Sequence, residues 1–512
     1  MYKYLMEKWI PWALAAASGV LLVVSYPPFG AGYVAWIALV PLMIALHDKQ
    51  GIDSFYIALA CGIIYFTGVM PWIYTVLTTY GHIWPPLAVI LTFILILYLA
   101  VYTGLYGLIL PAFGKTAEML FLSPFIIVLL EYARGHFLTG LPWALIAHTQ
   151  SYYPSVIQMA LFTGTAGVTF LIVLVNSSIA YAFIRTRSGG FQPRSLAPAA
   201  VAITLAIINT VWGQANIRHV KNLDGKEINA SIIQGNIDQD MKWDNKYRDT
   251  VIATYFTLSK SEAKKKPDLL VWPEASIPFF YGYDAMRTNF LNKLSESIDT
   301  PILFGGLGVE HSEDTGKNYY TNRAYLLNNG KVVGHYDKMH LVPFGEYVPL
   351  RKLLFFVNKI TKALSSDTTP GDTASPLTIN SIPLGSQICY EIIFAEPTRM
   401  FVRNGARLIT NITNDAWFGK SGASAQHMAS LPFRAVENRI AIIRSANTGI
   451  SGFVSATGEI SNTTELFKVA TANETLKVPD KSGTFYTRFG DVFTLACALL
   501  LATAYIRVRR RN

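Results

Sequence analysis

Apolar residues form long runs in the first 213 positions and again near the end of the chain. A membrane-spanning helix needs roughly 17 to 25 mostly apolar residues. Eight segments fit this pattern, namely 9–26, 32–47, 55–77, 86–113, 118–133, 163–184, 195–213 and 488–506. The segments 32–47 and 118–133 are short, and 118–133 also fits a re-entrant helix. The pattern therefore predicts an α-helical transmembrane bundle of about eight spans.

Residues 220–484 differ from this pattern, because short apolar runs alternate there with amphipathic stretches. The runs predict strands over 228–233, 268–272, 301–306, 324–327, 331–336, 382–389, 406–412, 440–446 and 452–455. The amphipathic stretches predict helices over 245–264, 284–299, 394–404 and 424–438. Asn329-Gly330 is a hairpin signal. We expect a layered α/β domain of mixed sheets at 220–484, between a bundle at 1–219 and a last span with a basic tail at 485–512.

The composition agrees with a membrane protein. The chain has 512 residues, of which 51% are hydrophobic and 15% charged, and its mean hydropathy is +0.31, values that are unusual for a soluble enzyme. The domain at 220–484 contains 29 Lys and Arg against 27 Asp and Glu, so it carries only +2 of the net +10. A near-neutral domain without a basic stripe does not support nucleic-acid binding.

The remaining basic residues predict the orientation, because Lys and Arg in short loops stay on the cytoplasmic side. With eight spans and a cytoplasmic N-terminus, only Arg134, Arg218 and Arg488 fall outside. Eleven residues fall inside, namely Lys3, Lys8, Lys49, Lys115, Arg185, Arg187, Arg194, Arg507, Arg509, Arg510 and Arg511. The α/β domain then lies on the outer face. The first apolar segment continues without a cleavage site, so we interpret it as a span and not as a signal peptide.

The chain has three cysteines, and only Cys389 lies outside the apolar segments. It ends the apolar run 382–389 and is followed by Tyr390 and Glu391. Two other strand-like runs end similarly in a charged residue, at Glu274 and Lys338. Acyl transfer through cysteine needs a thiolate, a base and a positive charge near the carbonyl oxygen. Each residue alone also has an ordinary interpretation, as an inert thiol, a helix cap or a surface amine.

The local sequences narrow these interpretations. The stretches Val271–Pro278 (VWPEASIP), Tyr336–Glu346 (YDKMHLVPFGE) and Ile388–Glu391 (ICYE) resemble, in order, the three catalytic motifs of the nitrilase superfamily. The stretches Gln234–Trp243 (QGNIDQDMKW) and Thr413–Gly419 (TNDAWFG) extend the resemblance. Together with the eight spans and Leu138–Trp143 (LTGLPW), they make the whole chain similar to the bacterial apolipoprotein N-acyltransferase family.

The resemblance implies a nitrilase-like αββα sandwich mounted on the bundle, in the bacterial cytoplasmic (inner) membrane with the catalytic domain on the periplasmic face. Cys389 would be the nucleophile, Glu274 the general base and Lys338 the stabiliser of the oxyanion. Glu346, Tyr390 and Glu391 match supporting positions of the family, and Trp243 matches a tryptophan that handles substrate.

The reaction implied by the resemblance has two steps and no cofactor. Cys389 takes an acyl chain from a membrane phospholipid as a thioester and releases a lysophospholipid. The chain then passes to the α-amino group of the diacylglyceryl-cysteine of a lipoprotein, which is the last step of lipoprotein maturation. The residues alone also fit a membrane-tethered carbon-nitrogen hydrolase (an amidase or nitrilase), or a transporter or scaffold that has lost activity.

Four further features are open at this point. Glu131 and Arg134, at i,i+3 spacing, fit either a mutual ion pair or contacts with a lipid headgroup or substrate. The segment 350–364 fits either a core helix or an interfacial arm. We expect no metal at His335, Asp337 and His340, because cysteine chemistry with a lysine needs none. Five aromatic residues fit either a lid that keeps water from the thioester or core packing; they are Phe279, Phe280, Phe344, Phe355 and Trp417.

Overall fold

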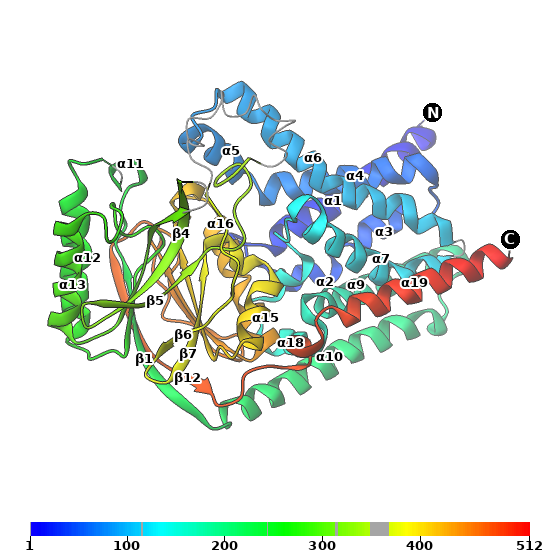
Figure 1. Ribbon diagram of the computed structural model, residues 1–512. Helices are drawn as coiled ribbons and strands as arrows, with labels where there is room; N and C mark the ends of the chain where they lie inside the picture. The colour runs from blue at the N-terminus through cyan, green and yellow to red at the C-terminus, as the bar shows by residue number, and fades with distance from the viewer. Residues whose placement is uncertain (1, 114–115, 243, 313–315, 349–367, 512) are drawn as a thin grey trace.

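The computed structural model describes residues 2–113, 116–242, 244–312, 316–348 and 368–511. A helical bundle and a layered α/β domain lie side by side (Figure 1). The chain forms the bundle first, enters the α/β domain through one long helix and returns to the bundle with its last helix. The two parts therefore meet along a broad junction, which the candidate site adjoins.

Six helices within the described residues are long and apolar enough to cross a membrane. They are α4 (Gly51–Val69), α6 (Pro85–Ile109, continued by η3, Leu110–Phe113), α7 (Thr116–His136), α9 (Ala160–Gly189), α10 (Pro193–Lys221) and α19 (Val492–Arg511). Two shorter apolar helical segments, Trp9–Ser25 of α1 (Tyr2–Ser25) and Gly32–Leu46, coincide with the first two predicted spans. Short helices connect these elements, namely α5 (Trp72–Thr75), η2 (Val76–Tyr80), η4 (Phe137–Thr139), η5 (Ile146–Gln150) and α8 (Pro154–Ile157).

The second apolar segment is broken into η1 (Gly32–Val34), α2 (Ala35–Ala38) and α3 (Val40–Leu46). Asn176 of α9 provides hydrogen-bond partners for main-chain groups at this break. Its amide nitrogen donates to the Ala35 carbonyl at 2.9 Å, and its oxygen accepts from the Leu39 N–H at 2.8 Å. Ser18 accepts from the N–H of Leu42 at 2.8 Å. Such side-chain partners are required where main-chain groups lie in a bilayer without helical partners.

Two six-stranded mixed sheets form the centre of the α/β domain. The first has the order β12-β1-β2-β3-β4-β5 and contains β1 (Gly225–Gln234), β2 (Leu269–Val271), β3 (Ile302–Ser312), β4 (Lys317–Asn328), β5 (Lys331–Asp337) and β12 (Ala470–Pro479). The second has the order β11-β10-β9-β8-β7-β6 and contains β6 (Leu377–Ile379), β7 (Ile382–Ile388), β8 (Leu408–Thr413), β9 (Ala441–Ala446), β10 (Gly452–Val454) and β11 (Ile460–Ser461). Strands β1, β2 and β3 run parallel, as do β7, β8 and β9.

Helices cover both outer faces of this sandwich, which gives the expected αββα layers (Figure 1). The first sheet carries α12 (Arg248–Ala263) and α13 (Ala285–Ile298), with the short α11 (Gln239–Lys242) nearby. The second sheet carries α15 (Ala395–Arg403), α16 (Ala423–Met428) and α17 (Leu431–Asn438), and these helices separate it from the bundle. The short elements η7 (Cys389–Ile393), η8 (Asp415–Phe418) and α18 (Phe485–Phe489) complete the domain and its exit.

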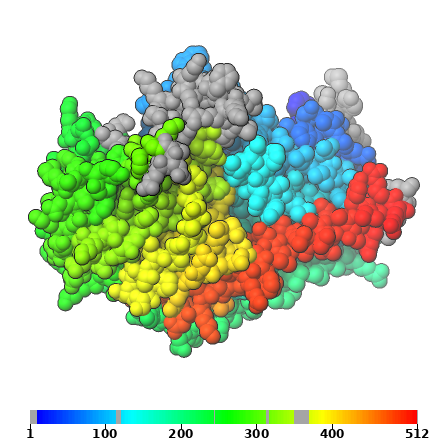
Figure 2. Space-filling view, in the orientation of Figure 1, coloured from blue at the N-terminus to red at the C-terminus, as the bar shows by residue number. Residues whose placement is uncertain are grey.

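Both chain termini lie at the end of the bundle that is far from the α/β domain (Figure 1). Helices α10 and α19 bury only 17% and 11% of their apolar windows inside the protein, and Figure 2 shows α19 in red along the surface. An apolar helix with so little protein around it needs another apolar surrounding, which a bilayer supplies. The chain is therefore a multi-pass membrane protein.

Candidate active site

Three strands end in, or just before, the three residues that the sequence singled out. Glu274 follows β2, Lys338 follows β5 directly, and Cys389 follows β7 directly. A sheet presents polar side chains where its strands end, because the backbone leaves the ladder there. The ends of β2 and β5 belong to the first sheet and the end of β7 belongs to the second, so the site lies where both sheets end.

Lys338 is the charged centre of this site. Its ammonium nitrogen lies 2.9 Å from Glu346 Oε2 and 3.8 Å from Glu274 Oε1, and the side chain is only 1% exposed. Burial alone would lower the pKa of Lys338, but the nearby Glu346 and Glu274 carboxylates raise it by more. The net pKa is therefore well above the usual value of a lysine. The amine is therefore a cation at any physiological pH. It also interacts electrostatically with the Cys389 sulfur.

Two asparagines hold the Glu274 carboxylate. Asn322 of β4 donates to Glu274 Oε1 at 2.7 Å and to Glu346 Oε1 at 2.9 Å. The main-chain N–H of Asn414, just after β8, donates to Glu274 Oε2 at 2.9 Å. Lys242 is fully buried and donates to the main-chain carbonyl of Glu274 at 3.3 Å; burial lowers the pKa of this lysine to about 8. The bonds from Asn322 and Asn414 therefore fix the direction of both Glu274 carboxylate oxygens.

Cys389 lies in a strained turn. Its φ is +53°, in the left-handed region that costs an ordinary residue of order 1–3 kcal/mol. Ala275, next to Glu274, has φ +46°. Burial and the Glu274 carboxylate raise the pKa of the Cys389 thiol, and Lys338 opposes them only in part. The resting group is thus a thiol, and its proton has to leave as the sulfur attacks.

Glu391 joins the Lys338 segment to the Cys389 segment. Its Oε1 accepts from the Tyr336 hydroxyl at 2.7 Å and from the N–H groups of Met339 at 2.8 Å and His340 at 3.0 Å, while its Oε2 accepts from the Ile388 N–H at 2.7 Å. The carboxylate is completely buried. Four donors on one carboxylate fix the distance between the ends of β5 and β7.

Tyr390 connects the site to the membrane bundle. Its hydroxyl donates at 3.2 Å to the carbonyl of Gly140, in the loop after α7. Its ring packs at 5.1 Å against Phe394, on which His340 stacks at 3.8 Å. The turn that carries Cys389 is therefore tied to the loop after α7 of the bundle. Trp243, the predicted substrate-handling residue, lies outside the described residues.

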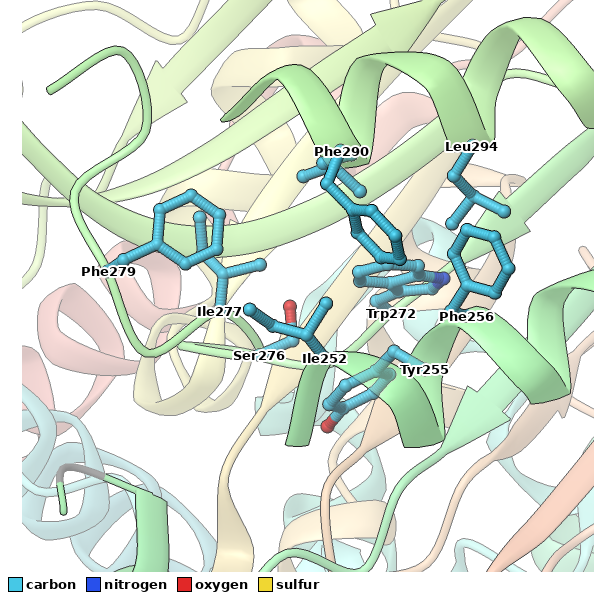
Figure 3. Close-up of a pocket in the computed structure, with 10 residues that line it drawn as sticks. Ile252, Tyr255, Phe256, Trp272, Ser276, Ile277, Phe279, Phe290 and Leu294 are labelled. Carbon is cyan, nitrogen blue, oxygen red and sulfur yellow. The ribbon is translucent and has the colours of Figure 1, made fainter. Parts of the chain in front are cut away.

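The lid hypothesis is wrong for Phe279. This residue is 6% exposed and belongs to the aromatic core between α12, α13 and the turn after β2, where it borders a hollow of only about 10 Å³ (Figure 3). Phe280 packs on Tyr320 at 5.8 Å. Phe344 and Trp417 are 51% and 36% exposed, so they remain available to a lipid or a substrate. Phe355 lies outside the described residues, as does the whole segment 350–364.

Glu131 and Arg134 form the mutual ion pair that one interpretation required, at 3.8 Å and with both side chains largely buried. Glu131 also accepts from the Ile146 N–H at 2.7 Å and from Thr169 Oγ1 at 2.8 Å, and Arg134 donates to the Ala144 carbonyl at 3.2 Å. These bonds fix the position of the loop after α7. The same loop carries the Gly140 carbonyl that accepts the hydrogen bond from Tyr390.

A cluster of possible metal ligands contains His335, Asp337 and Glu310, whose ligand atoms lie within 4.8 Å of one another. Arg323 pairs with both carboxylates, at 2.7 Å from Asp337 and 2.5 Å from Glu310, so a guanidinium already balances their charge. His340 does not join this group, because its ring stacks on Phe394.

Comparison with known proteins gives matches to both parts of the chain. Residues 18–178 match the family described as the apolipoprotein N-acyltransferase N-terminal domain, and residues 229–476 match the carbon-nitrogen hydrolase family. A protein named apolipoprotein N-acyltransferase from Geobacter metallireducens is 38% identical over 506 residues, covering 96% of this chain and 95% of its own length. A protein of the same name from Pasteurella multocida is 28% identical and covers 100% of this chain and 98% of its own length.

Among solved structures, a carbon-nitrogen hydrolase from Helicobacter pylori G27 is 17% identical, with a TM-score of 0.39; the match covers 49% of this chain and 90% of that protein.

Proposed function

Since the chain belongs to the apolipoprotein N-acyltransferase family, we propose that it acylates the α-amino group of lipoproteins through a thioester on Cys389. The observation that carries this mechanism is the buried group of Glu274, Lys338 and Glu346, in which Glu274 and Lys338 interact electrostatically with the Cys389 thiol. The relatives match over the membrane bundle as well as over the α/β domain, and this favours the acyltransferase over a small-molecule amidase.

In the first step, the Glu274 carboxylate takes the thiol proton while the Cys389 sulfur attacks an ester carbonyl of a membrane phospholipid. The carbonyl oxygen becomes negative and is stabilised by the Lys338 ammonium. The bond to the glycerol oxygen then breaks, and Glu274 returns the proton to that oxygen. The products are a lysophospholipid and an acyl thioester on Cys389.

In the second step, the free α-amino group of a diacylglyceryl-cysteine attacks the thioester carbonyl. Glu274 takes a proton from the amine, Lys338 again faces the oxyanion, and the sulfur leaves. The proton on Glu274 then returns to the Cys389 sulfur, so the enzyme regains its resting state. Glu346 balances the charge of Lys338 throughout, because its carboxylate lies 2.9 Å from the ammonium.

The place of this reaction is part of the proposal. We assign residues 1–219 and 485–512 to the bacterial inner membrane and residues 220–484 to its periplasmic face. The basic loops support this orientation, as do two termini at the far end of the bundle from the α/β domain. The hydrogen bond from Tyr390 to Gly140 keeps the sulfur beside the outer loops, where donor and acceptor lipids both arrive.

The test is to incubate membranes containing the full chain with a phospholipid labelled in its acyl chains. We expect a labelled thioester on Cys389 that hydroxylamine removes and that a diacylated lipopeptide discharges as its N-acylated form. Cys389→Ser should form no thioester, and Lys338→Ala should lower its rate of formation on the order of a hundredfold. Cys61→Ser is the matched control, because that thiol is buried inside α4 and should not affect the reaction. An active Cys389→Ala variant contradicts the proposal.

A further inference from the structure

Helix α16 contacts both the membrane bundle and the candidate nucleophile through two consecutive residues. Gln426 faces the bundle and is 6% exposed. Its amide donates at 3.0 Å to the carbonyl of Pro27, after α1, and at 3.0 Å to the carbonyl of Val69, at the end of α4. Its oxygen accepts from Trp143 Nε1 at 2.8 Å, in the loop after α7. One side chain thus joins three outer ends of the bundle.

His427, the next residue, faces the nucleophile turn. Its Nε2 lies 3.2 Å from the main-chain carbonyl of Cys389, and Asn411 Nδ2 donates to the same carbonyl at 3.3 Å. Because a carbonyl only accepts, Nε2 carries the proton in this contact. His427 therefore holds the main-chain carbonyl of the strained residue.

A buried ion pair fixes the other side of the ring. Asp415 Oδ1 and Arg444 Nη2 both lie 3.1 Å from His427 Nδ1, and the two partners pair with each other at 2.8 Å. Both side chains are completely buried. Burial and the Arg444 charge lower the pKa of His427. The two charged partners at Nδ1 hold the ring in place, so that Nε2 stays beside the Cys389 carbonyl.

We propose that Gln426 and His427 are positioning residues that hold the Cys389 turn in register with the outer ends of the membrane bundle. The left-handed φ of Cys389 has to be maintained by its surroundings, and two side chains hold its carbonyl. The bundle contributes to the chemistry in this way, besides anchoring the domain. The inference rests on the proposed role of Cys389 as the nucleophile.

The first experiment compares two amides at one position in the full chain. The His427→Gln variant places an amide nitrogen near the position of Nε2, and so keeps the bond to the Cys389 carbonyl. His427→Asn is equally polar but reaches only the position of Nδ1. Loss of positioning by about an ångström costs on the order of 10- to 100-fold in rate. We expect this loss of thioester formation for Asn and rates within about threefold of the native chain for Gln. Equal rates for the two variants would refute the role of His427.

The second experiment compares two buried glutamines. Gln158, 1% exposed, also makes three side-chain hydrogen bonds at the junction, to the Pro154 and Thr457 carbonyls and from Asn216. These three partners are not residues of the candidate site, so Gln158→Met is the control for Gln426→Met. We expect similar losses of thermal stability, but a loss of thioester rate of roughly tenfold only for Gln426→Met. Equal effects of the two substitutions on the rate would overturn the role of Gln426.

A double variant tests whether the two residues act as a unit. If they do, His427→Asn in the Gln426→Met background should cost less than in the native chain, whereas independent residues give costs that multiply. The positioning role of Gln426 and His427 and the proposed function of the protein can fail separately. Activity that survives Cys389→Ala ends the proposed function, whereas unaltered rates in the variants of Gln426 and His427 end only the positioning role.

Discussion

Replacing Glu391 by glutamine tests whether this buried carboxylate assembles the site. The two side chains have nearly the same shape, but glutamine offers one acceptor oxygen where the carboxylate offers two. Three donors face Oε1 and one faces Oε2, and all four bonds measure between 2.7 and 3.0 Å. In either orientation, the new amide group points its hydrogens at one or more buried donors.

The expected cost follows from these bonds. In the better orientation, the amide oxygen keeps three donors and the Ile388 N–H loses its partner. A lost hydrogen bond to a charged group costs about 1.5–3 kcal/mol, and the three that remain are weaker because the acceptor is now neutral. We expect a loss of about 3–5 kcal/mol in folding stability. Ile388 precedes Cys389 and Met339 follows Lys338, so thioester formation should fall on the order of a hundredfold.

The assay measures both quantities on the same preparation, namely the apparent melting temperature in detergent and the rate of thioester formation. The control is Glu396→Gln on α15, because that carboxylate is 57% exposed and pairs with Arg399 on the same helix. Exposed pairs of this kind contribute about 0–1 kcal/mol. A Glu391→Gln variant with native stability and native rate would refute the assembling role of this residue.

Three further changes test other parts of the site. Gly305→Ala would bring a Cβ to 2.7 Å from the Glu274 Cα, so we expect the variant to lose about 1–3 kcal/mol of stability and most of its thioester formation. Burial and the Lys338 charge lower the pKa of His340 to about 4, so the ring stays neutral in the native protein while it takes up a proton near pH 6.5 in the unfolded chain. The folding stability should therefore fall by about 1–2 kcal/mol between pH 7 and pH 5. The His340→Phe variant should lose this part of the pH dependence in thermal unfolding. Asn322→Asp would place a third carboxylate beside Lys338, so thioester formation at pH 7 should fall on the order of a hundredfold, with partial recovery as the pH is lowered.

The strands that carry Glu274, Lys338 and Cys389 were predictable because β2 and β7 are short apolar runs and β5 follows a hairpin signal, and a polar residue comes after each strand. Their lateral order was not, because pairing between distant segments leaves no local signal. Strand β12 (ATANETLKVP) was missed since half of its residues are polar and most are partly or fully exposed, as befits an edge strand. The break at Leu39 was also unpredictable, because it depends on Asn176, which lies 137 residues away in the chain.

The residues that orient the site were harder to find than the candidates themselves. Asn322 lies inside a strand with no motif around it, and only its bonds to Glu274 and Glu346 reveal its role. His427 lies within a predicted amphipathic helix, and the sequence pattern there does not distinguish a functional histidine from an ordinary core or surface residue. Asn414 belongs to the stretch TNDAWFG, whose resemblance to the family was the one available signal. Buried polar networks assemble from distant segments, so spacing along the chain does not show them.

The most direct test of the central claim is a chase experiment on the isolated acyl-enzyme. The full chain is first charged with acyl groups on Cys389, freed of phospholipid, and then mixed with a diacylated lipopeptide while both species are followed by mass spectrometry. The account predicts that the acyl mass leaves Cys389 and appears on the lipopeptide amine, at a rate at least equal to the overall turnover. A thioester that discharges more slowly than turnover, or only to water, would contradict it.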